Sequence, residues 1–419
     1  MNPRTTNSTA CFLIATLATT APAADWTSGL ADALTRDSEL TLHWRSHYLN
    51  RVRLGPVENL AWAGGGWLGY RSGWIADRLR LGLTGYSSQR LYGPLDKDGT
   101  SLLATGQQPY NVLGEAFGAL KLGDQTFTAG RFLVNQFEVN PQDTRMTPRT
   151  FEGAALTGTL GGTEYFAGYI DSMKHRNWDE FVQVATVAGA PATVTEPMLL
   201  LTARGTPTEA LTWGAATYYL PDLLSSTYAD VAWTTPLGPD TRGRLGAQFL
   251  RQTSVGDDRL TGSAFSTWTL GVKADLIQGP FTLSGILMET DRGAAYRTPF
   301  GSWRGYTSRI INNFNRAGER VWGLDAAIDF APFGAPGLSM NTSLSVGDDA
   351  INATTGAALS RNSEYDVTFD YRFTDPDWPS WARPLWLRAR AARLGQTLGD
   401  RTDVTTEYHL ILNYTHTFK

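Results

Sequence analysis

The 419-residue sequence is poor in cysteine, in lysine and in long apolar runs. Its one cysteine, Cys11, lies near the N-terminus, so the chain beyond residue 24 contains none. Lysine supplies five of the 36 basic residues, and arginine supplies the other 31. No apolar run approaches the roughly 20 residues that a membrane-spanning helix needs. The sequence therefore excludes a helical membrane protein.

Glycine and aromatic residues are abundant instead. The chain contains 43 glycines, 14 tryptophans, 16 tyrosines and 18 phenylalanines, while charged residues make up 18%. Mean hydropathy is slightly polar, at −0.24. The strands of a membrane β-barrel alternate lipid-facing apolar residues with lumen-facing polar ones, so their hydropathy averages out. This composition is typical of such a barrel and unlike that of an ordinary soluble enzyme.

The charge pattern bears on possible partners. Net charge is −4, which argues against nucleic acid as a partner. The arginine bias fits recognition of carboxylates, because a guanidinium pairs with them through a planar fork and stays charged. A GC-rich genome would produce the same bias, so the bias alone does not decide the function.

The N-terminus resembles an export signal. Arg4 precedes the short apolar stretch 11–18, and residues 21–23 (Ala-Pro-Ala) form a small-x-small cleavage site. We expect residues 1–24 to be a cleaved signal peptide. The remainder, 25–419, is expected to form one barrel domain in a bacterial outer membrane. We detect no helical periodicity and no interdomain linker in that remainder.

Two-residue alternation of apolar and polar side chains recurs from residue 39 to the C-terminus. In the first run, Leu40, Leu42 and Trp44 share one face, and histidines and arginines occupy the other. About eighteen such runs occur, most of them near the roughly 9–11 residues of a tilted membrane strand. Long connections alternate with tight turns, as outer loops and periplasmic turns do. The sequence therefore predicts an all-β fold, an antiparallel transmembrane barrel of about 18 strands.

The stretch 140–153 (NPQDTRMTPRTFEG) is predicted to be a loop that folds into the barrel and narrows it. Its two prolines each remove a backbone donor, so it cannot form a regular strand or helix. Residues 143–153 are similar to the segment D-x-R-L-x-P-Q-T-F-x-G of the OprD family of substrate-specific outer-membrane porins. Arg149 stands where that family often has glutamine, which adds positive charge at the predicted constriction.

The resemblance extends over nearly all of residues 25–418. Residues 37–51, 306–317 and 385–390 resemble the family's first strand, late region and penultimate strand. The last strand resembles the C-terminal signal of bacterial outer-membrane proteins, although Lys419 follows the usual final aromatic residue, Phe418. The resemblance implies an eighteen-stranded barrel whose third and seventh outer loops narrow the pore. It also implies an arginine-rich ladder that conducts carboxylate-bearing solutes.

The alternation and the resemblance together give three candidate groups. A charged side chain on the lipid face costs about 2–4 kcal/mol near mid-bilayer, so these residues are expected to face the lumen. The basic ladder comprises Arg45, Arg51, Arg53, Arg131, Lys273, Arg388 and Arg390. The constriction comprises Asp143, Arg145, Arg149 and Tyr306. An acidic wall, which would create a transverse field across the pore, comprises Asp325, Asp329, Glu364, Asp366 and Asp370.

We therefore expect a passive channel for small organic acids or amino acids, with several weak successive sites so that solutes can leave. No enzyme activity, cofactor or metal is expected, since the five histidines lack metal-ligand spacing. The expected partners are outer-membrane lipid, lipopolysaccharide and small anionic or zwitterionic solutes, with the protein a monomer or loose trimer. One alternative is a less selective or sugar-conducting porin guided by aromatic residues. A remote alternative is a barrel hydrolase built on His43, His47 and His409.

Overall fold

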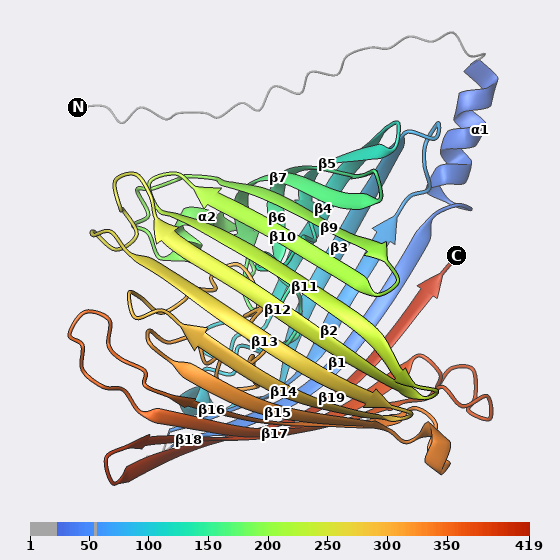
Figure 1. Ribbon diagram of the computed structural model, residues 1–419. Coiled ribbons are helices and arrows are strands. Elements are labelled where there is room, and N and C mark those ends of the chain that lie inside the picture. Colours follow the sequence, from blue (N-terminus) through green and yellow to red (C-terminus); the bar gives the residue numbers. More distant parts are fainter. Residues whose placement is uncertain (1–22, 54–56) are drawn as a thin grey trace.

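A computed structural model describes residues 23–53 and 57–419 and shows a closed antiparallel β-barrel (Figure 1). Eighteen strands pair in chain order, and β1 closes the wall by pairing with β19. The wall strands are β1 (Glu39–Val52), β2 (Glu58–Arg71), β3 (Leu79–Tyr92), β4 (Tyr110–Leu122), β5 (Gln125–Phe132), β6 (Thr150–Leu160), β7 (Thr163–Lys174), β9 (Met198–Thr208), β10 (Leu211–Leu220), β11 (Leu224–Gly238), β12 (Thr241–Ser254), β13 (Ser266–Gln278), β14 (Phe281–Thr290), β15 (Arg320–Asp329), β16 (Leu338–Asp348), β17 (Arg361–Arg372), β18 (Leu385–Leu398) and β19 (Arg401–Phe418). The predicted fold class and strand number are confirmed.

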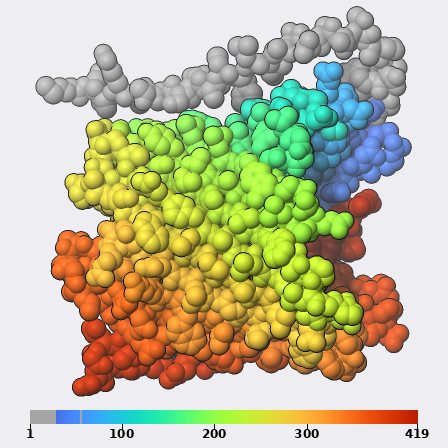
Figure 2. Space-filling model, in the orientation of Figure 1, coloured from blue at the N-terminus to red at the C-terminus, as the bar shows by residue number. Residues whose placement is uncertain are grey.

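The predicted alternation appears directly in the burial of β1. Leu40, Leu42 and Trp44 are 37–41% exposed on the outer face, whereas His43 and Arg45 are 7% exposed or less. The other strands repeat this pattern with exposed leucine, valine and aromatic side chains. Figure 2 shows the outer surface of the wall as a continuous layer of side chains. An apolar outer band with polar residues inside is the arrangement a bilayer requires of a barrel.

The two ends of the barrel differ. The C-terminus and the helix α1 (Ala23–Leu34) lie at the end where most connections are short turns, and most of the long loops lie at the other end (Figure 1). α1 ends against the β2–β3 turn, where the Gly73 amide donates to the Ala33 carbonyl at 2.7 Å. In the described ranges, no helix is long and apolar enough to cross a membrane. The predicted signal peptide falls almost entirely on residues 1–22, which lie outside the described part.

The prediction that residues 25–419 contain no helix is wrong. Besides α1, a short helix α2 (Val184–Ala188) and the 3-10 turns η1 (Leu95–Lys97) and η2 (Ala331–Phe333) occur between strands. The two-residue strand β8 (Val182–Gln183) precedes α2 and pairs with β7. The amphipathic face of α2 is one turn long, so it leaves little periodic signal in a sequence dominated by strand alternation.

Three of the long connections that turn inward are named by their order along the chain: loop 3 (133–149), loop 4 (175–197) and loop 7 (291–319). Apolar residues of these loops pack against inward-facing apolar residues of β5–β7 and β9–β11 in one buried cluster. Val139 of loop 3, Val184 of loop 4 and Phe300 of loop 7 all belong to it. The loops are thereby held against one side of the lumen. The predicted loop 140–153 is four residues too long at its C-terminal end, because residues 150–153 belong to β6 despite Pro148 nearby.

Gly66 permits the close pairing of β1 and β2. Its φ is +128°, and a Cβ there would lie 2.1 Å from the His43 carbonyl oxygen. Gly66→Ala should therefore destabilise the folded barrel by about 1–3 kcal/mol through backbone strain, plus the cost of the clash. The measurement is the loss of the heat-modifiable folded band on electrophoresis after heating in detergent. Gly118→Ala is the matched control, because a Cβ at Gly118 meets nothing within 4 Å; equal losses would contradict the argument.

Candidate functional site: the lumen path

A polar cavity of about 680 Å³ remains between the inward loops and the opposite arc of the wall. Strands β13–β19 and β1 line the cavity on the wall side, and loops 3, 4 and 7 line it on the other. Six basic side chains face it: Arg51, Arg145, Arg176, Lys273, Arg309 and Arg390. Two carboxylates, Asp325 and Asp366, face it as well. The lining is thus strongly basic although the whole chain is net acidic.

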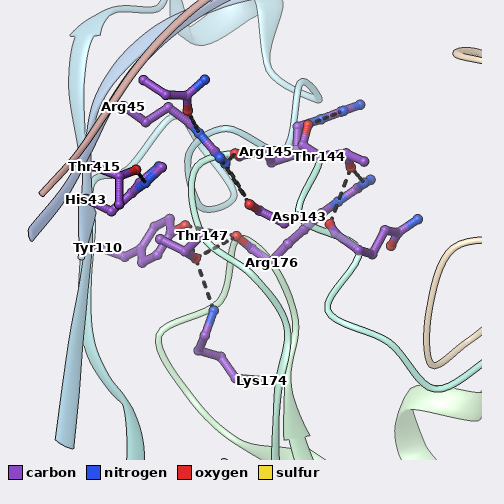
Figure 3. Close-up of polar contacts among 12 residues, drawn as sticks. His43, Arg45, Tyr110, Asp143, Thr144, Arg145, Thr147, Lys174, Arg176 and Thr415 are labelled. Atoms are coloured by element: carbon purple, nitrogen blue, oxygen red, sulfur yellow. Dashed lines mark hydrogen bonds and ion pairs between the residues drawn. The ribbon is translucent and has the colours of Figure 1, made fainter. Parts of the chain in front are cut away.

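Loop 3 is fastened to the wall by an ion pair. Arg45 on β1 holds Asp143 with both terminal nitrogens, Nη1 to Oδ1 at 2.6 Å and Nη2 to Oδ2 at 3.0 Å (Figure 3). The same guanidinium donates to Asn413 Oδ1 on β19 at 2.7 Å and to the backbone carbonyl of Arg145. A bidentate guanidinium–carboxylate pair fixes orientation as well as distance. Arg45 and Asp143 therefore act as a loop anchor, and neither side chain lines the cavity.

Loop 7 is fastened by carboxylates of the opposite wall. Glu364 on β17 accepts hydrogen bonds from the amides of Ile311 at 2.7 Å and Asn312 at 2.8 Å, and Asp366 accepts from Ile310 at 3.3 Å. Nearby, Arg309 Nη2 lies 2.8 Å from Asp325 Oδ1. Glu364 is fully buried. This part of the predicted acidic wall thus holds a loop as well as balancing the basic lining.

The remaining ladder residues differ in how completely they are paired. Arg51 pairs with Glu407 on β19, and Lys273 Nζ lies 3.2 Å from Asp275. Arg388 is held by Asp370 at 2.7 Å and does not line the cavity. Within residues 23–53 and 57–419, the Arg390 side chain makes one weak hydrogen bond, to Thr368 Oγ1 at 3.3 Å, and it faces the cavity.

Three predicted lumen residues lie elsewhere. Arg53 follows the last residue of β1 and is exposed. Arg131 pairs with Glu152 at 2.9 Å and has the parity of exposed Phe127, opposite the buried Phe132, so it points outward. Successive residues of a strand point to opposite faces. An uncertainty of one residue near the end of β5 therefore leaves the direction of Arg131 undetermined from the sequence. Asp329 is exposed at the β15–η2 junction, where its Oδ1 accepts from the Ala331 amide at 2.9 Å.

Two of the predicted constriction residues, Arg149 and Tyr306, do not line the cavity but pack behind the residues that do. Arg149 is buried between loops and donates from Nη1 to the Pro299 carbonyl of loop 7 at 2.8 Å; its Nη2 lies 2.9 Å from His175 Nε2 of loop 4. Tyr306 packs against a second buried apolar cluster, which includes Tyr228, Tyr296 and Trp303. Both residues shape the loops that face the cavity. Arg145 alone of the predicted constriction group lines it.

Two basic lining residues, Arg176 and Arg309, do not belong to any group predicted from the sequence. Both belong to loops, where alternation gives no information about direction. Leu49 offers the signal that could have indicated loop packing. It breaks the polar face of β1, and it is fully buried against Leu102, Leu103 and Met146. An apolar residue on an otherwise polar lumen face indicates that an inward loop covers it.

Glu138 joins loop 3 to loop 7 and to the wall. It accepts from the Tyr296 hydroxyl at 2.6 Å and from the Ser226 hydroxyl of β11 at 3.0 Å, and it is buried. Burial raises the pKa of the Glu138 carboxyl to about 7, while Tyr296, Ser226 and Arg304 oppose that rise. Because the pKa is raised in the folded loop, the contact has its full stability at low pH and loses stability as pH rises through about 7.

Channel noise should therefore increase as pH rises through about 7, because ionised Glu138 weakens the contact between loops 3 and 7. Planar-bilayer recordings over this range measure the effect. Glu138→Gln keeps a hydrogen-bonding group of the same shape without the titration, so its noise should be independent of pH. An unchanged pH response in that variant would assign the effect to other groups.

A closed barrel with an apolar outer face and an interior path narrowed by its own loops is an outer-membrane channel of the porin class. The family description "outer membrane porin, OprD family" matches residues 32–418. The chain therefore belongs to the OprD family of outer-membrane porins, and it is a channel rather than an enzyme. The predicted family is confirmed, and the hydrolase alternative is set aside.

Known relatives agree with this assignment. The chain is 26% identical over 337 residues to Porin D of Pseudomonas aeruginosa, covering 74% of this chain and 73% of Porin D. Its fold is similar to the crystal structure of P. aeruginosa OccK9 (OpdG), with a TM-score of 0.81, 24% identity, and coverage of 92% and 100%. It is also similar to P. aeruginosa OpdK with vanillate, with a TM-score of 0.80, 20% identity, and coverage of 91% and 99%.

Proposed function

We propose that this porin conducts small carboxylate-bearing solutes, such as organic acids or amino acids, along an arginine-lined path. The observation that carries the proposal is the charge of the cavity lining, where six basic side chains face two carboxylates. In a narrow lumen with low-dielectric walls, such an excess concentrates anions and lowers the barrier to their entry. Arg51, Arg145 and Arg390 would contact the solute carboxylate in succession, each contact weak enough to allow release.

The sugar-conducting alternative needs aromatic surfaces along the path. In the described part of the chain, Trp303 is the one tryptophan that lines the cavity, and no phenylalanine or tyrosine lines it. Trp303 is itself 4% exposed. One nearly buried indole is a poor guide for sugar rings, so the basic lining favours carboxylates. P. aeruginosa OpdK was solved with vanillate, itself a carboxylate.

The setting of the channel completes the proposal. Residues 1–24 would direct export and be removed, and 25–419 would form the functional domain. The apolar outer band would contact outer-membrane lipid, with lipopolysaccharide around the long loops. The protein would act as a monomer or a loose trimer.

Replacing Arg388 and Arg390 together by alanine tests the proposal. Carboxylate flux into proteoliposomes should fall severalfold, whereas flux of a neutral solute of equal size should hold or rise slightly. Most of the loss should come from Arg390, because Asp370 already neutralises Arg388. Arg320→Ala is the control, since Arg320 is 67% exposed outside the lumen path. Equal losses for charged and neutral solutes would remove the arginine path.

A further inference from the structure

We propose that the path prefers solutes that carry two separated carboxylates, held between a loop site formed by Arg145 and Arg176 and a wall site formed by Arg390 with Arg51. This inference rests on the proposed carboxylate function and names the class of carboxylate. It assigns a selectivity role to Arg176, a loop 4 residue.

Arg145 and Arg176 are joined into one site by Thr144. Arg145 Nη1 donates to the Thr144 carbonyl at 2.8 Å, and Arg176 Nη1 donates to the Thr144 hydroxyl at 2.8 Å (Figure 3). The Arg176 carbonyl in turn accepts from the hydroxyls of Tyr110 at 2.9 Å and Thr147 at 3.1 Å. Loops 3 and 4 thus present two guanidinium groups together. They do so from a framework that is fixed to β4 through Tyr110.

These guanidinium groups retain free donor capacity. Among the described residues, Arg176 and Arg390 have no carboxylate within 4 Å, and Arg176 Nε is buried without a partner. Arg145 has a carboxylate only at 3.8 Å, from Glu407. Buried donors without partners carry a desolvation cost that a bound carboxylate would relieve. The other basic lining residues, Arg51, Lys273 and Arg309, already have acidic partners.

The local charge exceeds what one carboxylate can balance. Four guanidinium groups, those of Arg51, Arg145, Arg176 and Arg390, share this region with two carboxylates that are already engaged, Glu407 and Asp366. Burial lowers the pKa of the Arg145 guanidinium to about 9, and repulsion from Arg176, Arg51 and Arg390 contributes to that shift. A monoanion would leave much of this repulsion in place. A dianion whose charges reach both sites would relieve more of it.

The other charged groups around the path are already engaged. Asp366 is bound by the Ile310 amide and by the Ser343 hydroxyl at 3.2 Å, and Asp325 is bound by Arg309. His409 is held by Glu407 at 2.6 Å and His47 at 2.9 Å. Arg51 and Arg145 both lie against Glu407, so among the described residues the lining guanidinium groups without a carboxylate within 4 Å are Arg176 on loop 4 and Arg390 on β18. Two such groups on different elements suit two carboxylates on one carbon chain better than one point charge.

Uptake of succinate, succinamate and succinamide into proteoliposomes tests the inference, because these solutes have nearly equal size and carry two, one and no negative charges. Wild-type protein should transport them in that order. Arg176→Gln should reduce the succinate-to-succinamate ratio roughly fivefold, the factor that corresponds to about 1 kcal/mol. Arg176→Lys should retain part of the ratio, and Arg320→Gln, which removes a charge outside the path, should leave it unchanged.

The outcomes separate the two claims. If succinamate is carried as fast as succinate and both exceed succinamide, the dicarboxylate preference is wrong and the carboxylate function stands. If all three solutes move equally fast, the proposed function itself fails. Inorganic phosphate, whose charges lie on one group, should compete with succinate poorly; equal competition would overturn the two-site arrangement. Retained single-channel conductance and heat-modifiability show that each variant is folded.

Discussion

Deleting residues 136–146 should raise the single-channel conductance severalfold. This segment contains Asp143, which anchors loop 3 to β1, and Glu138, which joins loop 3 to loop 7. The wall does not depend on it, because each wall strand pairs with its neighbours through the backbone. Removing the segment widens the cross-section without opening the barrel. Conductance follows the narrowest cross-section of a pore, so the effect is large.

The matched control for this deletion is a deletion of the same kind outside the lumen. Residues 353–357 lie between β16 and β17 and are exposed throughout. Their removal should leave conductance near the wild-type value. Planar-bilayer recording of both variants measures the difference. If the loop 3 deletion conducts no more than the wild type while remaining folded, loop 3 does not set the pore width.

Arg45→Met should release loop 3 from the wall. The noise of the single-channel current and the mean conductance should then both increase. Arg45 is buried, and the substitution leaves Asp143 and Asn413 Oδ1 without their donors. Breaking a buried pair costs about 3–5 kcal/mol, but Asp143 is 36% exposed, so solvent screening reduces the expected loss of loop docking to about 2 kcal/mol. Proteolytic cleavage within loop 3 should accelerate accordingly.

A double-mutant cycle with Asp143→Asn separates this pair from the other contacts of Arg45. Neighbouring partners in one network typically show coupling of about 0.5–3 kcal/mol. The double variant should therefore be less perturbed than the sum of the two single variants. Strict additivity, measured from loop cleavage rates, would mean that the ion pair does not hold the loop.

The strands of the barrel wall could be predicted from the sequence because apolar and polar side chains alternate regularly along them. A strand buried between lipid and lumen must alternate, so the parity of Leu40, Leu42 and Trp44 indicated the outer face and predicted the inward direction of Arg45 and Arg51. The same parity placed Arg390 correctly on the wall of the cavity. Arg131 points outward instead, because it lies near the end of β5, where one residue of boundary error reverses the face. Arg53 lies beyond the end of β1 and is exposed.

Which of the inward charged residues are paired with acids and which are free could not be predicted from the sequence. Whether an inward arginine is free or paired depends on contacts between residues far apart in sequence, such as Arg45 with Asp143 and Arg51 with Glu407. Loop direction is likewise set by tertiary packing, which is why Arg176 and Arg309 were missed. The structure places the predicted ladder residue Arg45 in a loop anchor, pairs Arg51, Lys273 and Arg388 with carboxylates of the wall, and leaves Arg145, Arg176 and Arg390 as the lining arginines least paired with acids.

The most direct test of the arginine path is the reversal potential across a planar bilayer with a salt gradient. Anion selectivity is expected in the wild type, because the cavity lining is basic. Arg176→Gln and Arg390→Gln should each shift the potential toward cation selectivity, and Arg320→Gln should not. Cation selectivity in the wild type, unchanged by either lumen variant, would contradict the arginine path while leaving the barrel and its family intact.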